Sequence, residues 1–313
     1  MGHVALMFPG QGAQVVGMAK DFHENFTESR LLFEEASDSI GVNIARLCFD
    51  GPLQELTLTE NLQPALLTAE IAMLAGLRVD RELKVAAYLG HSLGEYSAHV
   101  AAGSLKFADA VRLTRLRGKA MQEAVPPGTG AMAAVLGLDA DAVAALCREA
   151  HKNSRQVVEA ANFNAPGQIV ISGGTLAVAE VERLVAANPE FKRVKLIPLQ
   201  VSAPFHCALM EPARLAMKGP LYQTKFSAPS APIVANLTAR PTDNEAEFAA
   251  LLADQIVGSV RWQQSVEALP ALLISECVEV GPGSVLTGLL KRINSQLTGR
   301  AISTVKALKG WTG

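Results

Sequence analysis

The chain has 313 residues, which is enough for one large domain or two moderate ones with a buried core. Lys and Arg number 28 and Asp and Glu number 30, so the net charge of -2 leaves no excess of positive charge for binding nucleic acid. Hydrophobic residues make up 49% of the chain and charged residues 19%, which excludes a mainly disordered or coiled-coil protein. No nucleic-acid partner is expected.

The sequence does not predict a membrane-bound, exported or metal-binding protein. Its most apolar stretch, residues 65–77, is interrupted by Glu70 and is shorter than the roughly 18 residues that cross a bilayer. Residues 3–8 are too short for the apolar region of a secretory signal and follow no basic residue. The four cysteines are far apart and form no C-x-x-C pair, so neither a disulfide framework nor a zinc site is expected. We expect a cytoplasmic protein with no metal.

The first part of the chain alternates short apolar runs with longer helical patterns, which is typical of an α/β protein. Residues 4–8 are apolar and end at a Pro-Gly pair, and residues 85–89 are apolar and end at Gly90, so both segments are predicted to be buried strands. Residues 107–124 have helical spacing and end before a Pro-Pro-Gly sequence. We expect the strands to form a parallel sheet.

The pattern changes after residue 126, where it becomes β-α-β-β-α-β, the order of a ferredoxin-like domain. We expect residues 127–199 to form an inserted ferredoxin-like subdomain. Residues 1–126 and 200–313 are expected to form one α/β-hydrolase-like catalytic domain around the parallel sheet. The elements predicted beyond residue 126 are strands at 131–138, 157–162, 168–172, 194–199, 233–236 and 277–280, and helices at 139–150, 176–187, 245–255 and 285–292.

The sequence from Gly90 to Gly94 is Gly-His-Ser-Leu-Gly, a G-x-S-x-G motif between a predicted strand and a helical pattern. At such a strand-to-helix turn the glycines permit a sharp bend and the serine Oγ stands exposed as a nucleophile. The N–H groups that follow lie at the helix N-terminus, where they can hold an oxyanion. Ser92 is therefore a candidate nucleophile, and an ordinary glycine turn is the alternative.

A nucleophilic serine needs a base, and the chain has six histidines. His91 is adjacent to Ser92 and is expected to project elsewhere, while His99 lies about two turns further along the same helix. His206 follows an apolar run and a break at Pro204, so it is predicted to lie on a loop after a strand end. Open α/β sheets gather functional residues at such ends. His206 is the best candidate base, and a purely structural histidine is the alternative.

The predicted helix at 107–124 carries one misplaced charge. A helical wheel puts Arg117 in the same sector as the apolar residues Val111 and Met121. A buried arginine must pair with an internal carboxylate or with a ligand, because an isolated buried charge is too costly. The pattern leaves open a ligand-binding arginine, an internal ion pair and a side chain that snorkels to the surface.

Seven motifs, in this order along nearly the whole chain, resemble the malonyl-CoA:acyl carrier protein transacylase family. Members of this family load malonyl groups in fatty-acid and polyketide synthesis. So many motifs in order and at family-like spacing are specific together. They are Phe8-Pro-Gly-Gln-Gly12, Gln63-Pro-Ala, Gly90-His-Ser-Leu-Gly-Glu95, Arg117-Gly-Lys-Ala-Met121, Asn162-Phe-Asn-Ala-Pro-Gly-Gln168, Ser202-Ala-Pro-Phe-His206 and Glu279-Val-Gly-Pro-Gly283.

The resemblance assigns roles to residues already selected from their chemistry. It implies that Ser92 is the nucleophile, that His206 is its base and that Arg117 binds the malonyl carboxylate. It also implies an oxyanion hole made by the backbone N–H groups of Gln11 and Leu93. In place of an aspartate, the backbone carbonyl of Gln255 is expected to orient the histidine. The other residues expected to contribute to substrate binding are Gln63, Met121, Asn162, Gln168 and Phe205.

The resemblance further implies malonyl-CoA and an acyl carrier protein as substrates, with no separate cofactor. Nothing in the sequence requires more than a monomer, and a monomer is expected. The bulky Phe205 before the histidine implies malonyl rather than methylmalonyl transfer. A free-standing polyketide acyltransferase, a serine hydrolase or thioesterase, and a non-enzymatic docking module are the alternatives. Basic residues that could meet an acidic carrier are Lys192, Arg193, Lys195, Lys291 and Arg292.

Overall fold

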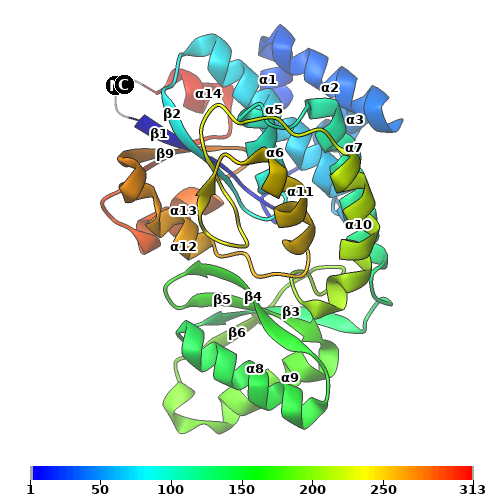
Figure 1. Cartoon of the computed structure of the whole chain (residues 1–313), viewed down its shortest axis with the longest axis vertical. Helices are drawn as coiled ribbons and strands as arrows, with labels where there is room; N and C mark the ends of the chain where they lie inside the picture. The colour runs from blue at the N-terminus through cyan, green and yellow to red at the C-terminus, as the bar shows by residue number, and fades with distance from the viewer. Residues whose placement is uncertain (1–2, 312–313) are drawn as a thin grey trace.

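The computed structural model describes residues 3–311 and has two separate β-sheets with helices packed on them (Figure 1). The larger sheet has six strands, and its neighbouring pairs are parallel except for the last pair, β7 and β8, which is antiparallel. The α/β fold with a mainly parallel sheet is thereby confirmed. In sheet order the strands are β10 (Thr298–Ile302), β9 (Ile274–Val280), β1 (His3–Phe8), β2 (Val85–Gly90), β7 (Ile233–Val234) and β8 (Pro241–Thr242).

The central strands are buried on both faces, which explains their continuous apolar runs. In β1, Leu6 and Phe8 belong to one hydrophobic cluster, while Ala5 and Met7 belong to another that contains Trp262. The side chains alternate between the faces because a strand repeats every two residues. The helices around this sheet are α1 (Lys20–Asn25), α2 (Thr27–Ile40), α3 (Ile44–Asp50), α4 (Leu53–Leu56), α5 (Thr59–Asp80), α6 (Gly94–Ala101), α7 (Phe107–Glu123), α10 (Glu211–Gln223), α11 (Glu245–Asp254), α12 (Trp262–Glu267), α13 (Val285–Ile293) and α14 (Val305–Lys309), with the 3₁₀ turns η2 (Ala208–Met210) and η3 (Leu269–Leu272).

Helix α5 is the core helix of this domain. Within residues 3–311 it is the one helix long and apolar enough to cross a membrane, with 22 residues and a mean hydropathy of 1.3 in its most apolar window. However, 83% of that window is buried inside the fold. The apolar character of α5 is therefore explained by packing against the rest of the protein.

The smaller sheet is built from the segment between residues 130 and 198, and its four strands are antiparallel. Figure 1 shows it below the larger sheet, with its two long helices on the face turned away from that sheet. A third hydrophobic cluster lies between these helices and the strands. The predicted β-α-β-β-α-β order is confirmed. In sheet order the strands are β4 (Val158–Ala165), β5 (Gln168–Gly174), β3 (Gly130–Leu136) and β6 (Lys195–Pro198), and the helices are α8 (Ala140–Ser154), α9 (Thr175–Ala187) and the 3₁₀ turn η1 (Pro189–Phe191).

The two parts are joined where the loop after α11 runs alongside β4. The Val260 N–H donates to the Ala161 carbonyl at 2.8 Å, and the Phe163 N–H donates to the Val260 carbonyl at 2.9 Å. The Ser259 hydroxyl adds a bond to the Ala160 carbonyl at 2.7 Å. This bridge fixes the position of β4, which carries Asn162, relative to the larger sheet.

One edge of the larger sheet differs from the sequence prediction. The strand expected at 233–236 is only two residues long, and the sheet continues through the antiparallel β8. The strand ends at Val234 because the chain then turns: the Ala235 carbonyl accepts from the Ala239 N–H. The Asn236 side chain accepts from the Ser92 N–H, in the site described below. Two-residue strands carry too little periodicity to be recognised in a sequence.

Candidate active site

Ser92 lies at a sharp turn between β2 and α6, in a left-handed conformation with a φ of 53°. A non-glycine residue rarely adopts this conformation, and it marks stored strain. A Cβ added at Gly90 would lie 1.9 Å from the Gly94 carbonyl carbon, and one added at Gly94 would lie 2.1 Å from the Phe8 carbonyl oxygen. Both positions therefore require glycine, and the turn has the strained geometry of a nucleophile elbow rather than that of an ordinary glycine turn.

The buried side chain of Asn236 holds this turn from both sides. The Ser92 N–H donates to Asn236 Oδ1 at 2.6 Å, and Asn236 Nδ2 donates to the Gly90 carbonyl at 2.6 Å. Since buried backbone groups need partners, Asn236 stabilises the strained conformation. Asn236 was not among the site residues predicted from the sequence, where it appears only as the polar end of the apolar strand expected at 233–236.

His206 lies beside Ser92, although 114 residues separate them along the chain. Its Nε2 is 2.7 Å from Ser92 Oγ, and its Nδ1 is 2.8 Å from the Gln255 backbone carbonyl. A carbonyl can only accept, so Nδ1 carries the hydrogen and Nε2 is free to accept a proton from the serine. The chain thus places a carbonyl where many serine enzymes have a carboxylate.

Burial, followed by the charge of the nearby Arg117, lowers the pKa of His206 to about 3. The imidazole is therefore neutral at neutral pH, as a base must be before it accepts a proton. The negative charge that develops on a reacting carbonyl would compensate the imidazolium once it forms.

Arg117 lies on α7 with only 1% of its surface exposed. Its Nη1 donates to Gln63 Oε1 at 2.9 Å, and its Nη2 donates to Gln255 Oε1 at 2.8 Å and to Ser92 Oγ at 3.1 Å. None of the ion pairs formed within residues 3–311 includes Arg117. The side chain neither snorkels nor pairs with an internal carboxylate, so its charge is available to an anionic ligand beside Ser92.

These groups meet at a small cavity, here called the acyl pocket. Its volume of about 100 Å³ is several times the roughly 10–15 Å³ that one water molecule requires, so it can hold an acyl group of a few heavy atoms. The backbone N–H groups of Gln11 and Leu93 have no hydrogen-bond acceptor among the described residues. The lining residues are Gln11, Gln63, His91, Ser92, Leu93, Arg117, Met121, Met132, Asn162, Leu199, Val201, Phe205 and His206.

Gln168, which was expected to bind substrate, lies away from the acyl pocket, whereas His91, which was excluded as the base, lines it. Gln168 was expected near the acyl pocket or His206. However, it begins β5 and accepts a hydrogen bond from Arg292, because the β4–β5 hairpin carries it away from the pocket. His91 also lines the pocket, but its ring projects away from Ser92 as expected, with its Nε2 2.8 Å from Asn164 Oδ1 and its ring packed near Trp262. His99 is distant as expected, and its Nδ1 bonds to the Ser104 hydroxyl.

Glu95 is a second site residue that was not predicted from the sequence; it is 1% exposed and lies in the first turn of α6, three residues after Ser92. Its Oε2 accepts from Gln255 Nε2 at 2.7 Å and from the Asn236 N–H at 3.1 Å. Glu95 was visible in the sequence only as the last letter of a motif. Its partners lie 141 and 160 residues away, so no local pattern indicates them.

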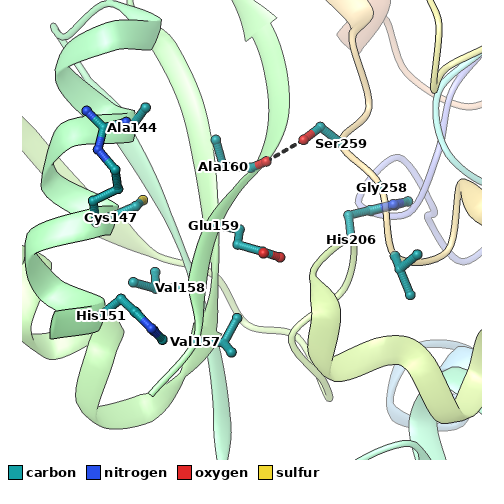
Figure 2. Close-up of a pocket in the computed structure, with 12 residues that line it drawn as sticks. Ala144, Cys147, His151, Val157, Val158, Glu159, Ala160, His206, Gly258 and Ser259 are labelled. Carbon is teal, nitrogen blue, oxygen red and sulfur yellow. Dashed lines mark hydrogen bonds between the residues drawn. The ribbon is translucent and has the colours of Figure 1, made fainter. Parts of the chain in front are cut away.

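His206 also lines a larger cavity of about 540 Å³, here called the outer cavity (Figure 2). Figure 2 shows His151 and Cys147 on α8, Glu159 on β4, and Gly258 beside His206. Burial raises the pKa of the Cys147 thiol to about 12, so it is not a ready nucleophile. Ser92 and Arg117 do not line this cavity, and among the described residues its Ser259 hydroxyl and its His151 ring bond to backbone carbonyls and not to each other. The other lining residues are Ala144, Arg148, Val157, Val158, Ala160, Val257 and Ser259.

Comparison with known proteins agrees with this geometry. The family model described as "Acyl transferase domain" matches residues 5–307. The malonyl CoA-acyl carrier protein transacylase of Escherichia coli K12 is 44% identical over 308 residues, which cover 98% of each chain. The enzyme of the same name from Bacillus subtilis is 41% identical over 309 residues, covering 99% of this chain and 96% of that one.

Solved structures give the same result. The acyl-carrier-protein-S-malonyltransferase of Bartonella henselae superposes with a TM-score of 0.93 at 39% identity, covering 98% of this chain and 97% of that one. A malonyl-transacylase solved in complex with a type II PKS acyl-carrier protein superposes with a TM-score of 0.92 at 39% identity, covering 98% of each chain. The resemblance drawn from the seven motifs is confirmed, and the chain belongs to the acyl transferase domain family.

Proposed function

We propose that the chain transfers a malonyl group from malonyl-CoA, through an acyl-Ser92 intermediate, to the phosphopantetheine thiol of an acyl carrier protein. The observation that carries this proposal is the buried Arg117 guanidinium, which pairs with no carboxylate among residues 3–311 and lies 3.1 Å from the Ser92 hydroxyl. A buried cation beside a nucleophile favours an acyl group that brings its own carboxylate. The names of the relatives agree with this choice of substrate.

In the first half-reaction, Ser92 Oγ attacks the thioester carbonyl while His206 Nε2 accepts the hydroxyl proton. The N–H groups of Gln11 and Leu93 hold the tetrahedral oxyanion. The Ser92 N–H is excluded from this role because it donates to Asn236. When the oxyanion collapses, the C–S bond breaks and the imidazolium returns its proton to the coenzyme A sulfur.

The second half-reaction runs the same steps in reverse, with a different thiol. His206 accepts the proton of the phosphopantetheine thiol while the sulfur of that thiol attacks the carbonyl of the Ser92 ester. The C–Oγ bond then breaks, and the imidazolium returns the proton to Ser92 Oγ. Because the partner of His206 Nδ1 is a carbonyl rather than a carboxylate, the imidazolium is less stabilised than in a hydrolase. Weaker activation of water would preserve the acyl-serine until a thiol arrives.

Selectivity is assigned to the walls of the acyl pocket. Arg117 clamps the carboxylate, and Gln63 holds the guanidinium from the side of α5. Met121, Asn162 and Phe205 complete the walls near Ser92. Acetyl-CoA brings no carboxylate and would leave the arginine unpaired, so discrimination on the order of 10³ is expected.

The carrier is expected to approach the five exposed basic residues named from the sequence. Arg292 already bonds to the β4–β5 hairpin, which brings part of this basic surface beside the smaller sheet. We assign the carrier to fatty-acid synthesis, and a polyketide carrier is the second candidate because one structural relative was solved with such a partner.

The same proposal covers the organisation of the molecule. We assign residues 127–199 to the subdomain, and residues 1–126 with 200–313 to the catalytic domain.

The nucleophile, the base and the arginine all come from one chain, so a monomer suffices. We assign the protein to the cytoplasm, since its four cysteines are free and buried. The chemistry uses the two thioester substrates and assigns no step to a cofactor.

The test is to incubate the protein with malonyl-CoA and measure its intact mass, and then to add fatty-acid and polyketide carrier proteins in parallel. We expect one malonyl adduct that Ser92→Ala abolishes, followed by loss of the adduct when the correct carrier is added. Rapid release of free malonate without a carrier would indicate a hydrolase instead. Failure to form an adduct in the parent protein would overturn the proposal.

A further inference from the structure

Glu95 occupies a junction between three parts of the active site. Its Oε2 accepts a hydrogen bond from the Asn236 N–H, and Asn236 holds the Ser92 turn. The same oxygen accepts from the side-chain amide of Gln255, whose backbone carbonyl holds His206. Glu95 itself does not line the acyl pocket, so a role for it must act through these neighbours.

The side-chain amide of Gln255 lies between two hydrogen-bond acceptors on its Nε2 side and a hydrogen-bond donor on its Oε1 side. Its Nε2 donates to the Ser92 carbonyl at 2.9 Å and to Glu95 Oε2 at 2.7 Å, which uses both of its hydrogens. Its Oε1 then faces Arg117, whose Nη2 lies 2.8 Å away and can only donate. Turning the amide over would set its oxygen against two acceptors and its nitrogen against a cation.

The Gln255 side-chain amide helps to fix the orientation of the Arg117 guanidinium. Its Nη2 is shared between Gln255 Oε1 and Ser92 Oγ, while Nη1 is held by Gln63. If Gln255 turned away, one side of the guanidinium would lose its acceptor and the fork would no longer be fixed beside the nucleophile. A misplacement of about 1 Å is enough to lose much of the benefit of a preorganised contact.

We infer that Glu95 is a positioning residue, which holds the Gln255 side-chain amide and thereby aims Arg117 at the carboxylate of the incoming acyl group. This inference rests on the proposed function and adds to it a determinant of acyl selectivity outside the pocket. Burial raises the pKa of Glu95 to about 7, so the neutral acid is populated near neutral pH. Glutamine is therefore a close substitute, since its oxygen can accept the same two hydrogen bonds.

The experiment compares Glu95→Leu with Glu95→Gln and measures kcat/KM for malonyl-CoA and for acetyl-CoA on the same preparation of each variant. The ratio of the two values cancels any loss of folded protein. For Glu95→Leu we expect the malonyl-to-acetyl ratio to fall about 10- to 100-fold, mainly through a higher KM for malonyl-CoA. For Glu95→Gln we expect the ratio to stay within about 3-fold of the parent.

A double-mutant cycle tests whether Glu95 acts through the Gln255 side chain. Gln255→Leu should lower the ratio by itself, and adding Glu95→Leu should then change it by less than about 2-fold. Independent, multiplicative losses would overturn the inference. Glu70→Leu is the matched control, because Glu70 is equally buried and bonds to Ser97 rather than to the site, so its ratio should match the parent.

The outcomes separate this inference from the proposed function. A parent protein that does not prefer malonyl-CoA would overturn the proposed function, whatever the variants do. A parent that prefers malonyl-CoA, together with an unchanged ratio in Glu95→Leu, would overturn only the role of Glu95. A ratio that falls equally in Glu95→Gln would also contradict it, because the hydrogen bonds would then not be the determinant.

Discussion

His206 lines both the acyl pocket and the outer cavity, and these two regions differ in ways that matter for catalysis. The outer cavity is about five times larger, at about 540 Å³ against about 100 Å³, yet its charged residues are exposed and its cysteine is inert. The acyl pocket has a strained nucleophile within hydrogen-bond distance of both a neutral base and a buried cation. Reactive chemistry therefore follows the hydrogen-bond network rather than the size of the cavity.

The largest effect expected from this contrast is that of Ser92→Ala. The acyl pocket would keep its arginine and its base but lose the atom that forms the ester. We predict that malonyl transfer falls by at least about 10⁴-fold, measured as labelled malonyl moved to the carrier. A residual rate within about 10-fold of the parent would mean that a nucleophile outside the acyl pocket carries the reaction.

A second prediction concerns the pH dependence of acyl-Ser92 formation. The pKa of His206 is lowered to about 3, so lowering the pH from 7 to 5 leaves the base neutral. Single-turnover acylation by malonyl-CoA should change by less than about 3-fold, whereas a base with an ordinary histidine pKa of 6.5 would slow the reaction by about 25-fold. A loss of that larger size would contradict the environment assigned to His206.

A third prediction concerns the support of the elbow. Asn236→Ala removes the partners of two backbone groups, the Ser92 N–H and the Gly90 carbonyl, and each such loss costs about 1–3 kcal/mol. The free energy of unfolding, measured in urea, should fall accordingly. Asn153→Ala, at an exposed position on α8, is the control and should change stability by less than about 0.5 kcal/mol. Equal effects of the two substitutions would show that Asn236 does not support the strained turn.

The smallest effect is expected in the outer cavity. Arg148→Ala and His151→Ala remove exposed side chains that contact neither Ser92 nor Arg117, so malonyl transfer with saturating carrier should stay within about 2-fold of the parent. A loss comparable to that of an acyl-pocket variant would mean that the outer cavity takes part in substrate binding.

The site residues that could be predicted from the sequence are those with a local motif or an unusual chemical position. Ser92 followed from its motif, and Arg117 from a charge on an apolar helix face. His206 followed from its position after a strand end. Asn236 and Glu95 could not be found this way, because their partners are more than a hundred residues distant and become neighbours only through folding.

The errors have equally specific causes. Gln168 was placed by resemblance alone, and the hairpin turn directs it to Arg292. The exclusion of His91 as the base holds, because its ring bonds to Asn164 and packs near Trp262, while His206 bonds to Ser92. The fold was predictable where strands were long and buried on both faces, and it was not predictable at β7 and β8, where two-residue strands have no pattern.

The most direct test of the account is the ratio of kcat/KM for malonyl-CoA to that for acetyl-CoA in Arg117→Ala. Since both values come from one preparation, the ratio reports the use of the buried cation and not the amount of active protein. Arg112→Ala, an exposed arginine on the same helix, is the control and should leave the ratio unchanged. We predict that Arg117→Ala lowers the ratio by about 10³-fold. An unchanged ratio in that variant would contradict the claim that Arg117 binds the malonyl carboxylate.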